Sequence, residues 1–358
     1  MPFVLKGGLY IEKAATDMMV AADTEEMMSE GGWVRKDFWR RRNSSQLSEI
    51  IRQQDVDDQL RVYDVEASFA SQDGLEEIDF ELGPDLTLKV LPFGVETVID
   101  YVEQAAADPV IDYASRKTQD AKFKFFQSLE KVAADKIRDP ATLTFGRALT
   151  NAERLDNYAS PQSNPILQLV MLIQSIKNDV GHKPNVIGID DLTWQYGFKL
   201  HPFAIARSPV HVAPSIMGAG ATLTPTLLES ILELAPGTIK IYDRRFNPRR
   251  KGETTGAVRK SFMGSDIVGA YVQDPNLYST GFGFETCFTG LAELPADYPF
   301  AVLTYDDPKR GLYGSQRVRI VSLINWTVLR AASAYRITNT VDLTDQNKYF
   351  YRSFAVLD

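Results

Sequence analysis

Residues 60–90 alternate apolar and polar side chains over one long stretch, and this alternation constrains the fold more than any other feature of the chain. A period of two residues is typical of β-strands that bury one face. Two short segments, 73–74 and 83–85, interrupt it with Gly, Pro and Asp residues that favour turns. The pattern predicts a long antiparallel hairpin or meander whose apolar residues are Tyr63, Val65, Ala67, Phe69, Ile78, Phe80, Leu82, Leu86, Leu88 and Val90.

The polar side of this ribbon is strongly acidic. Its carboxylates either keep an exposed ribbon soluble, which is the default interpretation, or present a negative face to a partner. A two-stranded ribbon buries too little apolar surface to be stable by itself, so it needs a neighbour on which to lie. The acidic residues are Asp64, Glu66, Glu76, Glu77, Asp79 and Glu81.

The composition is that of an ordinary globular protein. Of the 358 residues, 44% are hydrophobic and 24% are charged, which excludes disordered and collagen-like classes. The 39 Lys and Arg residues against 47 Asp and Glu residues give a formal charge of −8, so any attraction to DNA, RNA or anionic lipid must be local. No N-terminal run resembles a signal peptide, and the apolar stretch 166–176 is too short to span a bilayer. We therefore expect a chain made in the cytoplasm that has no membrane partner.

Catalytic and metal-binding signatures are missing from the sequence. It has no P-loop, dinucleotide-binding fingerprint, serine-hydrolase elbow or H-E-x-x-H pair. Cys287, the only cysteine, is expected to be a buried apolar residue, and His201 is expected to end a helix as a favourable imidazolium. The acidic pairs 190–191 and 306–307 are explained by a helix start and a turn. We expect no catalytic residue, no cofactor and no metal site.

Helical and strand signals alternate through the rest of the chain. Residues 116–138 carry an apolar stripe at helical spacing with many lysines around it, which predicts a long amphipathic helix. Asn164 and Pro165 indicate the start of a second helix, which Gly181 ends. Further elements predict a mixed sheet of the α+β or α/β type. They are short helices at 190–202 and after Thr224, and strands at 184–189, 239–242, 267–272, 317–325 and 328–337, the last two paired with each other.

Two segments concentrate positive charge. Residues 33–42 interleave five basic residues with three aromatic ones. They form either an arm that docks on another surface or a frayed terminus with solvated charges, and the composition favours the frayed terminus. Residues 244–251 place five cations in a loop interrupted by Pro248. That loop is either idle or pairs with acidic segments of other copies or with other polyanions.

A series of short motifs follows one another along the centre of the chain. The first is 158–166, Tyr-Ala-Ser-Pro-Gln-Ser-Asn-Pro-Ile, before a helix; 181–188, with a Pro-Asn strand, comes next. In this order the motifs resemble the central part of tailed-phage major capsid proteins, over roughly residues 45–340. The later motifs are Trp194 with His201-Pro202, then 262–271, then 305–308 with Gly311, then 334–339.

The resemblance implies an α+β protein with the HK97-like capsid fold. Two features depart from the family: Gln195-Tyr-Gly197 stands where aliphatic residues are usual, and no cleavable N-terminal scaffold domain is evident. In chain order, the resemblance implies an N-terminal arm at 1–44, an extended β-hairpin called the E-loop at 45–92, and a peripheral domain at 93–155 with a long spine helix at 116–138. An axial domain would follow at 156–314, and 315–358 would return to the peripheral sheet and form the C-terminus.

The family also implies a function. Copies of the chain would assemble as hexamers and pentamers into an icosahedral shell around double-stranded DNA, bound without sequence specificity. The protein would belong to the virion after assembly in the host cytoplasm, with scaffold, portal and decoration proteins as further partners. We expect acidic residues of the hairpin to approach basic segments 40–42 or 244–251 of adjacent copies. The candidate contact residues are Arg40, Arg41, Arg42, Glu76, Glu77, Glu81, Arg244, Arg245, Arg249, Arg250 and Lys251.

Two alternatives remain at this point. An encapsulin-like compartment shell shares the fold but carries protein cargo, so the contents of the particle distinguish it from a capsid. A soluble α/β enzyme with an unrecognised site predicts a small oligomer with a deep polar pocket instead of a hollow particle.

Overall fold

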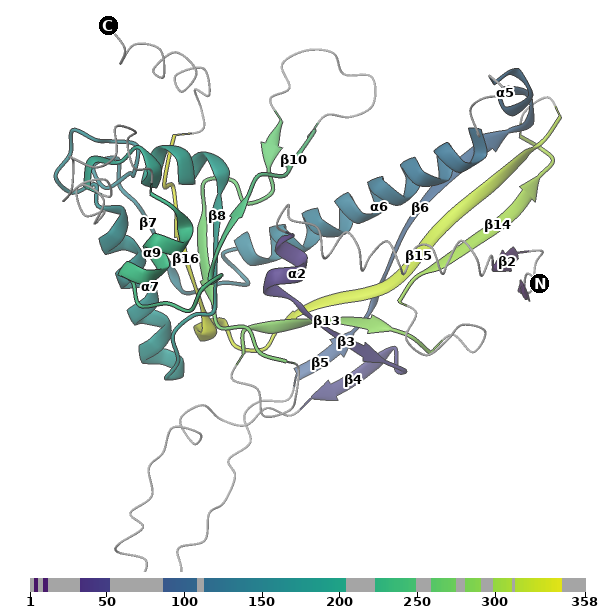
Figure 1. The fold of residues 1–358 in the computed structure, drawn as a ribbon. Coiled ribbons are helices and arrows are strands. Elements are labelled where there is room, and N and C mark those ends of the chain that lie inside the picture. Colours follow the sequence, from purple (N-terminus) through teal and green to yellow (C-terminus); the bar gives the residue numbers. More distant parts are fainter. Residues whose placement is uncertain are drawn as a thin grey trace, which may run out of the picture.

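Two β-sheets, each with its own long helix, lie next to each other in the part of the chain that the structure describes (Figure 1). The structure is a computed structural model. The described residues are 3–5, 9–11, 33–51, 86–107, 113–203, 223–248, 259–274, 281–290, 299–310 and 313–342.

The larger sheet has seven strands and is built around one long strand, β15 (Ser315–Val328). β6 (Leu91–Asp100) pairs antiparallel with one side of β15. On the other side, β14 (Ala301–Asp307) and then β13 (Gly283–Phe288) pair with successive parts of it. Beyond β14, β2 (Leu9–Ile11) pairs with it and β1 (Phe3–Leu5) pairs with β2. Beyond β13, β3 (Arg40–Ser44) pairs parallel to it.

Helix α6 (Tyr113–Arg138) runs along β6 and β15 and covers one face of this sheet (Figure 1). It begins three residues before the predicted 116–138 and ends at the predicted residue. Its apolar stripe repeats every four residues and is buried, so the helix forms where its side chains can leave water. The stripe consists of Ala121, Phe125, Leu129, Ala133 and Ile137. The short helix α5 (Tyr101–Ala106) connects β6 to it, and Asp100 caps that helix by accepting a hydrogen bond from Val102 N at 2.8 Å.

The smaller sheet has five strands with their own hydrophobic core. Helix α7 (Pro165–Val180) packs against it, with Asn164 Oδ1 accepting from Leu167 N at 3.1 Å and Gly181 in the left-handed region at φ 79°, as the sequence predicts. Thr224 caps α9 (Pro225–Ile231) in the same way. In order across the sheet, the strands are β7 (Gly146–Ala148), β16 (Ala334–Thr338), β12 (Ile267–Ala270), β8 (Val186–Asp190) and β9 (Ile239–Tyr242).

Two short strand pairs stand apart from the sheets. β4 (Ser48–Ile51) pairs antiparallel with β5 (Leu86–Lys89), and β10 (Arg245–Phe246) pairs with β11 (Lys260–Ser261). The β4–β5 pair lies at the two ends of the predicted hairpin. Residues 52–85, with Glu76, Glu77 and Glu81, lie outside the described residues.

One predicted strand pairing is wrong. Segments 317–325 and 328–337 do not pair, because β15 belongs to the larger sheet and β16 to the smaller one. The chain crosses between the sheets through a 3₁₀ turn at Ala331–Ser333. Alternation along the sequence identifies a strand and its buried face but does not identify the strand beside it.

The predicted domain boundaries do not coincide with those of the two sheets. Residues 156–314 contribute β8, β9 and β12 to the smaller sheet, yet β13 and β14 to the larger one. Residues 315–358 are divided in the same way between β15 and β16, and 343–358 lie outside the described residues. Each sheet is therefore assembled from segments that are discontinuous in the chain.

The predicted short helix at 190–202 is a π-helix, Thr193–Lys199. Its Gly197 lies against Leu155, and a Cβ at that position would be 3.0 Å from Leu155 Cβ. This close approach explains why a glycine stands where aliphatic residues were expected. Within the described ranges, none of the helices combines the length and apolar character that crossing a membrane requires.

Candidate functional site

The N-terminal segment 33–44 is anchored in the larger core and is not a frayed terminus. Helix α2 (Val34–Phe38) packs against α6, and Trp33, Val34, Phe38 and Trp39 are all buried. Trp39 Nε1 donates to the carbonyl of Ala133 on α6 at 3.3 Å. The expectation of solvated charges was wrong here because the aromatic residues between them fill the core. Of the basic residues in this segment, Arg35 is 3% exposed.

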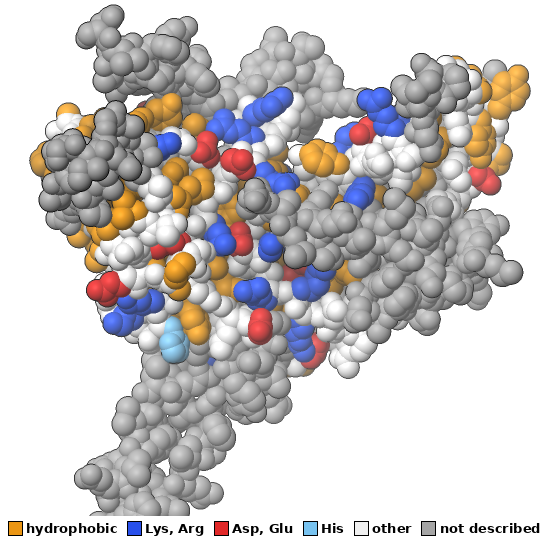
Figure 2. Space-filling model, in the orientation of Figure 1, with side chains coloured by type: hydrophobic (Ala, Val, Ile, Leu, Met, Phe, Trp, Pro, Cys, Tyr) orange, Lys and Arg blue, Asp and Glu red, His pale blue; other side chains and the backbone are white. Residues whose placement is uncertain are grey.

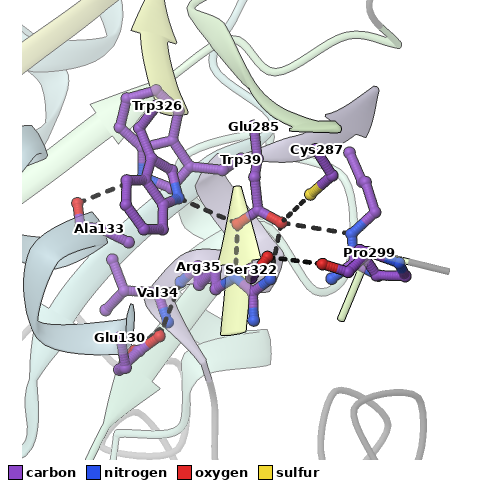
Figure 3. Close-up of polar contacts among 11 residues, drawn as sticks. Val34, Arg35, Trp39, Glu130, Ala133, Glu285, Cys287, Pro299, Ser322 and Trp326 are labelled. Atoms are coloured by element: carbon purple, nitrogen blue, oxygen red, sulfur yellow. Dashed lines mark hydrogen bonds and ion pairs between the residues drawn. The ribbon is translucent and has the colours of Figure 1, made fainter. Parts of the chain in front are cut away.

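Glu285 on β13 is the centre of a buried polar cluster that holds this segment (Figure 3). Arg35 binds its carboxylate through two nitrogens, with Nη2 2.7 Å from Oε1 and Nε paired with Oε2. Trp326 Nε1 donates to Oε2 at 3.0 Å, and Arg41 Nε donates to Oε1 at 3.3 Å. Burial alone would raise the pKa of Glu285, but Arg35, Arg41 and the Cys287 thiol lower it to about 2. The carboxylate is therefore ionised and fully partnered at neutral pH.

A second buried carboxylate, Glu130 on α6, binds the backbone of the same segment (Figure 3). Its Oε1 accepts from Val34 N at 2.7 Å, and its Oε2 accepts from Arg35 N at 3.0 Å. These two N–H groups belong to the first turn of α2, so they have no carbonyl partner within the helix. The side chain of Trp33 does not cap them. Burial raises the pKa of Glu130 to about 7, although the two N–H donors and Arg35 oppose the shift.

Together the two carboxylates fasten α2 between α6 and β13. All four carboxylate oxygens of Glu285 and Glu130 accept from donors of this chain, so the cluster positions a backbone segment and leaves no oxygen aimed at a ligand. Sequence reasoning missed both residues. The signal for Glu285 was a single charge within the apolar run 282–288, and such a charge needs a buried partner.

The three arginines of β3 have different surroundings. Arg40 is exposed. Arg41 contacts Glu285, and Arg42 Nη2 lies 2.7 Å from Glu49 Oε1. Two of the three predicted contact residues therefore pair with carboxylates of their own chain.

The second basic segment, 244–251, is described only in part. The guanidinium of Arg244 lies 3.7 Å from the ring centroid of Trp33, so this arginine also contacts the anchored segment. Arg245 is half-buried in β10. Arg249, Arg250 and Lys251 lie outside the described residues.

The contact between Ser163 and His201 is the arrangement in the described chain that most resembles a catalytic pair. His201 Nδ1 accepts from Phe203 N at 3.2 Å, which assigns the ring proton to Nε2. Nε2 then donates to Ser163 Oγ at 3.0 Å, and Ser163 Oγ donates to the carbonyl of Arg154 at 2.7 Å. A general base would need Nε2 free to accept the serine proton. This pair therefore has the wrong tautomer for activating a nucleophile.

His201 also corrects the prediction of a charged helix end. The residue is 1% exposed, and burial lowers its pKa to about 4, so the imidazole is neutral at physiological pH. The prediction that Cys287 is a buried residue is confirmed, and burial raises the pKa of its thiol. Among the described residues, no group of three or more His, Cys, Asp or Glu side chains is placed to hold a metal ion.

Comparison with known proteins identifies similar folds among solved structures. No protein-family model and no curated protein sequence matches the chain. A phage-related protein from Bordetella bronchiseptica RB50 is similar in structure, with a TM-score of 0.63 and 16% identity over 92% of this chain and 97% of that one. The capsid protein of Cyanophage P-SCSP1u is also similar, with a TM-score of 0.53 and 11% identity over 86% and 88% of the two chains. The chain therefore has the fold of a phage capsid protein.

Proposed function

We propose that this chain is a major capsid protein that assembles with copies of itself into an icosahedral shell around double-stranded DNA. The observation that supports this proposal is the agreement in fold with a phage capsid subunit over most of both chains. Shell formation also explains the predicted hairpin, because a ribbon that is marginal by itself becomes stable when it lies on a neighbouring copy.

In this proposal the larger sheet with α6 is the peripheral domain, and α6 is its spine helix. The smaller sheet with α7 and α9 is the axial domain. The β4–β5 pair is the foot of the E-loop, whose remaining residues are 52–85. The arm is 1–32, since 33–44 is fastened in the core by Glu130 and Glu285.

Electron microscopy of the purified full chain tests the proposal. We expect hollow particles of uniform diameter after incubation under assembly conditions, with and without co-expressed neighbouring phage proteins. Particles isolated from infected or expressing cells should contain nuclease-protected DNA. Protein cargo in place of DNA would indicate a compartment shell, and small oligomers under every condition would contradict shell formation.

A further inference from the structure

The net charge of −8 belongs to one segment and not to the body of the protein. Residues 52–85 contain eleven Asp and Glu residues and two Arg residues, a net charge of −9. The rest of the chain therefore carries a net charge of about +1. Within this near-neutral body, α6 contains seven Lys and Arg residues and three Asp and Glu residues, one of which is the buried Glu130. Helix α6 therefore carries a net charge of +4 and concentrates positive charge within a body that is close to neutral overall.

The lysines of α6 form a row along the helix. Lys117, Lys124 and Lys131 are seven residues apart, which is close to two helical turns, so they project from the same side at intervals of about 10 Å. Lys124 and Lys131 are exposed, and Arg116 and Lys136 flank the row. Blue side chains are visible along α6 in Figure 2.

The lysines of this row have few and exposed partners within the chain. Lys124 in the row, and Arg116 and Lys136 near its two ends, have no ion-pair partner in the part of the chain that the structure describes. Lys131 pairs with Asp135 one turn away and its Nζ lies 5.5 Å from the ring centroid of Phe246. Lys117 lies 3.9 Å from Glu103, and its Nζ lies 5.1 Å from the ring centroid of Tyr113. Both ion pairs are exposed, and such pairs contribute little to stability and can exchange for a phosphate.

We propose that this row on α6 contacts the phosphate backbone of the enclosed DNA, an inference that rests on the proposed function. Lysine is a hydrated point charge on a flexible chain and makes loose contacts without base readout. A regular row about 20 Å long suits the evenly charged surface of a duplex. The number of contacts is small, as is appropriate for a genome that must be released.

The acidic segment 52–85 of another copy is the competing occupant of this row. That segment alternates charged with apolar and aromatic residues, so a matching surface needs apolar side chains as well as cations. The outward side of α6 offers one exposed large apolar residue, Phe123. The chemistry of the row therefore favours phosphate over the ribbon.

Salt-dependent binding of the unassembled full chain to a fluorescent 30-base-pair duplex tests the proposal. The row variant is Lys117→Gln, Lys124→Gln, Lys131→Gln, since Gln has a helix propensity close to that of Lys. The slope of log K against log salt should decrease in magnitude by up to about 2.7. The control variant, Lys177→Gln, Lys199→Gln, Lys309→Gln, has the same change in net charge and should leave the slope unchanged.

Three outcomes would overturn the proposal. The first is equal weakening of DNA binding in the control variant, which would indicate net charge alone. The second is unchanged binding in the row variant. The third is that a synthetic peptide of residues 52–85 binds to the wild type but not to the row variant, while both proteins bind the duplex equally. Electron microscopy of shells tests the proposed function by a separate measurement. If the wild type forms shells but the row variant binds the duplex as the wild type does, only the role of α6 is refuted.

Discussion

Glu285 shows what a charge needs in the core of this protein. It is 1% exposed and is bound by Arg35, Trp326 and Arg41. Its lowered pKa contributes stability that is present above the unfolded pKa near 4.5 and is lost as the pH falls toward 2. Glu285→Gln should destabilise the chain by about 3–5 kcal/mol, because it leaves Arg35 buried without its counter-ion. Denaturant unfolding of the unassembled chain measures the effect.

A double substitution provides the control for Glu285. Replacing the pair by Arg35→Met and Glu285→Leu removes both charges at similar volume and should recover most of the stability lost in the single variant. A single variant within about 1 kcal/mol of wild type would contradict the role assigned to the pair.

Glu130 should respond to pH in the opposite direction. Its pKa is raised to about 7, so between pH 4.5 and 7 the folded chain retains a proton that the unfolded chain has released. Its contribution to stability therefore falls as the pH rises through this window, by up to about 3 kcal/mol. Unfolding free energies at pH 5 and pH 8 measure this for wild type and Glu130→Gln.

The informative quantity is the stability of wild type minus that of Glu130→Gln. We expect this difference to be smaller at pH 8 than at pH 5. A difference that grows with pH would mean that the N–H groups of Val34 and Arg35 hold the carboxylate ionised well below pH 7.

At the scale of elements, the contact between α7 and β12 depends on a glycine. A Cβ at Gly269 would lie 2.3 Å from Leu172 Cδ2, so a larger residue must displace the Leu172 side chain or the helix that carries it. Gly269→Ala should reduce stability by about 1–3 kcal/mol, measured by chemical denaturation. Adding Leu172→Val makes room at the contact and should restore part of the loss. Equal stability of Gly269→Ala and wild type would contradict the dependence of this contact on glycine.

Elements with local signals were predicted well. The stripe of α6 repeats every four residues, and Asn164, Thr224 and Gly181 act within three or four residues of themselves. The pairing of β15 and β16 was not predicted, because strands of equal periodicity are interchangeable until tertiary contacts select their partners.

At the scale of the whole molecule, the acidic segment should set the salt dependence of assembly. We expect the variant Glu76→Gln, Glu77→Gln, Glu81→Gln to assemble more weakly at low salt and to lose part of its salt dependence, because contacts with arginines of adjacent copies would be removed. Light scattering during assembly measures both effects. A matched variant, Asp179→Asn, Glu233→Gln, Asp274→Asn, changes the net charge equally. If both variants behave alike, or neither differs from wild type, the acidic residues do not make these contacts.

The long helix, the capped helices and the buried Cys287 follow from the amino-acid sequence alone, as does a resemblance to capsid proteins that the fold supports. Each depends on residues a few positions apart, where periodicity and capping operate. Contacts between distant parts of the chain are what place Trp33, Val34, Phe38 and Trp39 in the core. Arg35 and Glu285 are 250 residues apart, and Val34 and Glu130 are 96 apart. Whether a charge is solvated or buried depends on such distant partners, because only a folded chain brings the neutralising group to it.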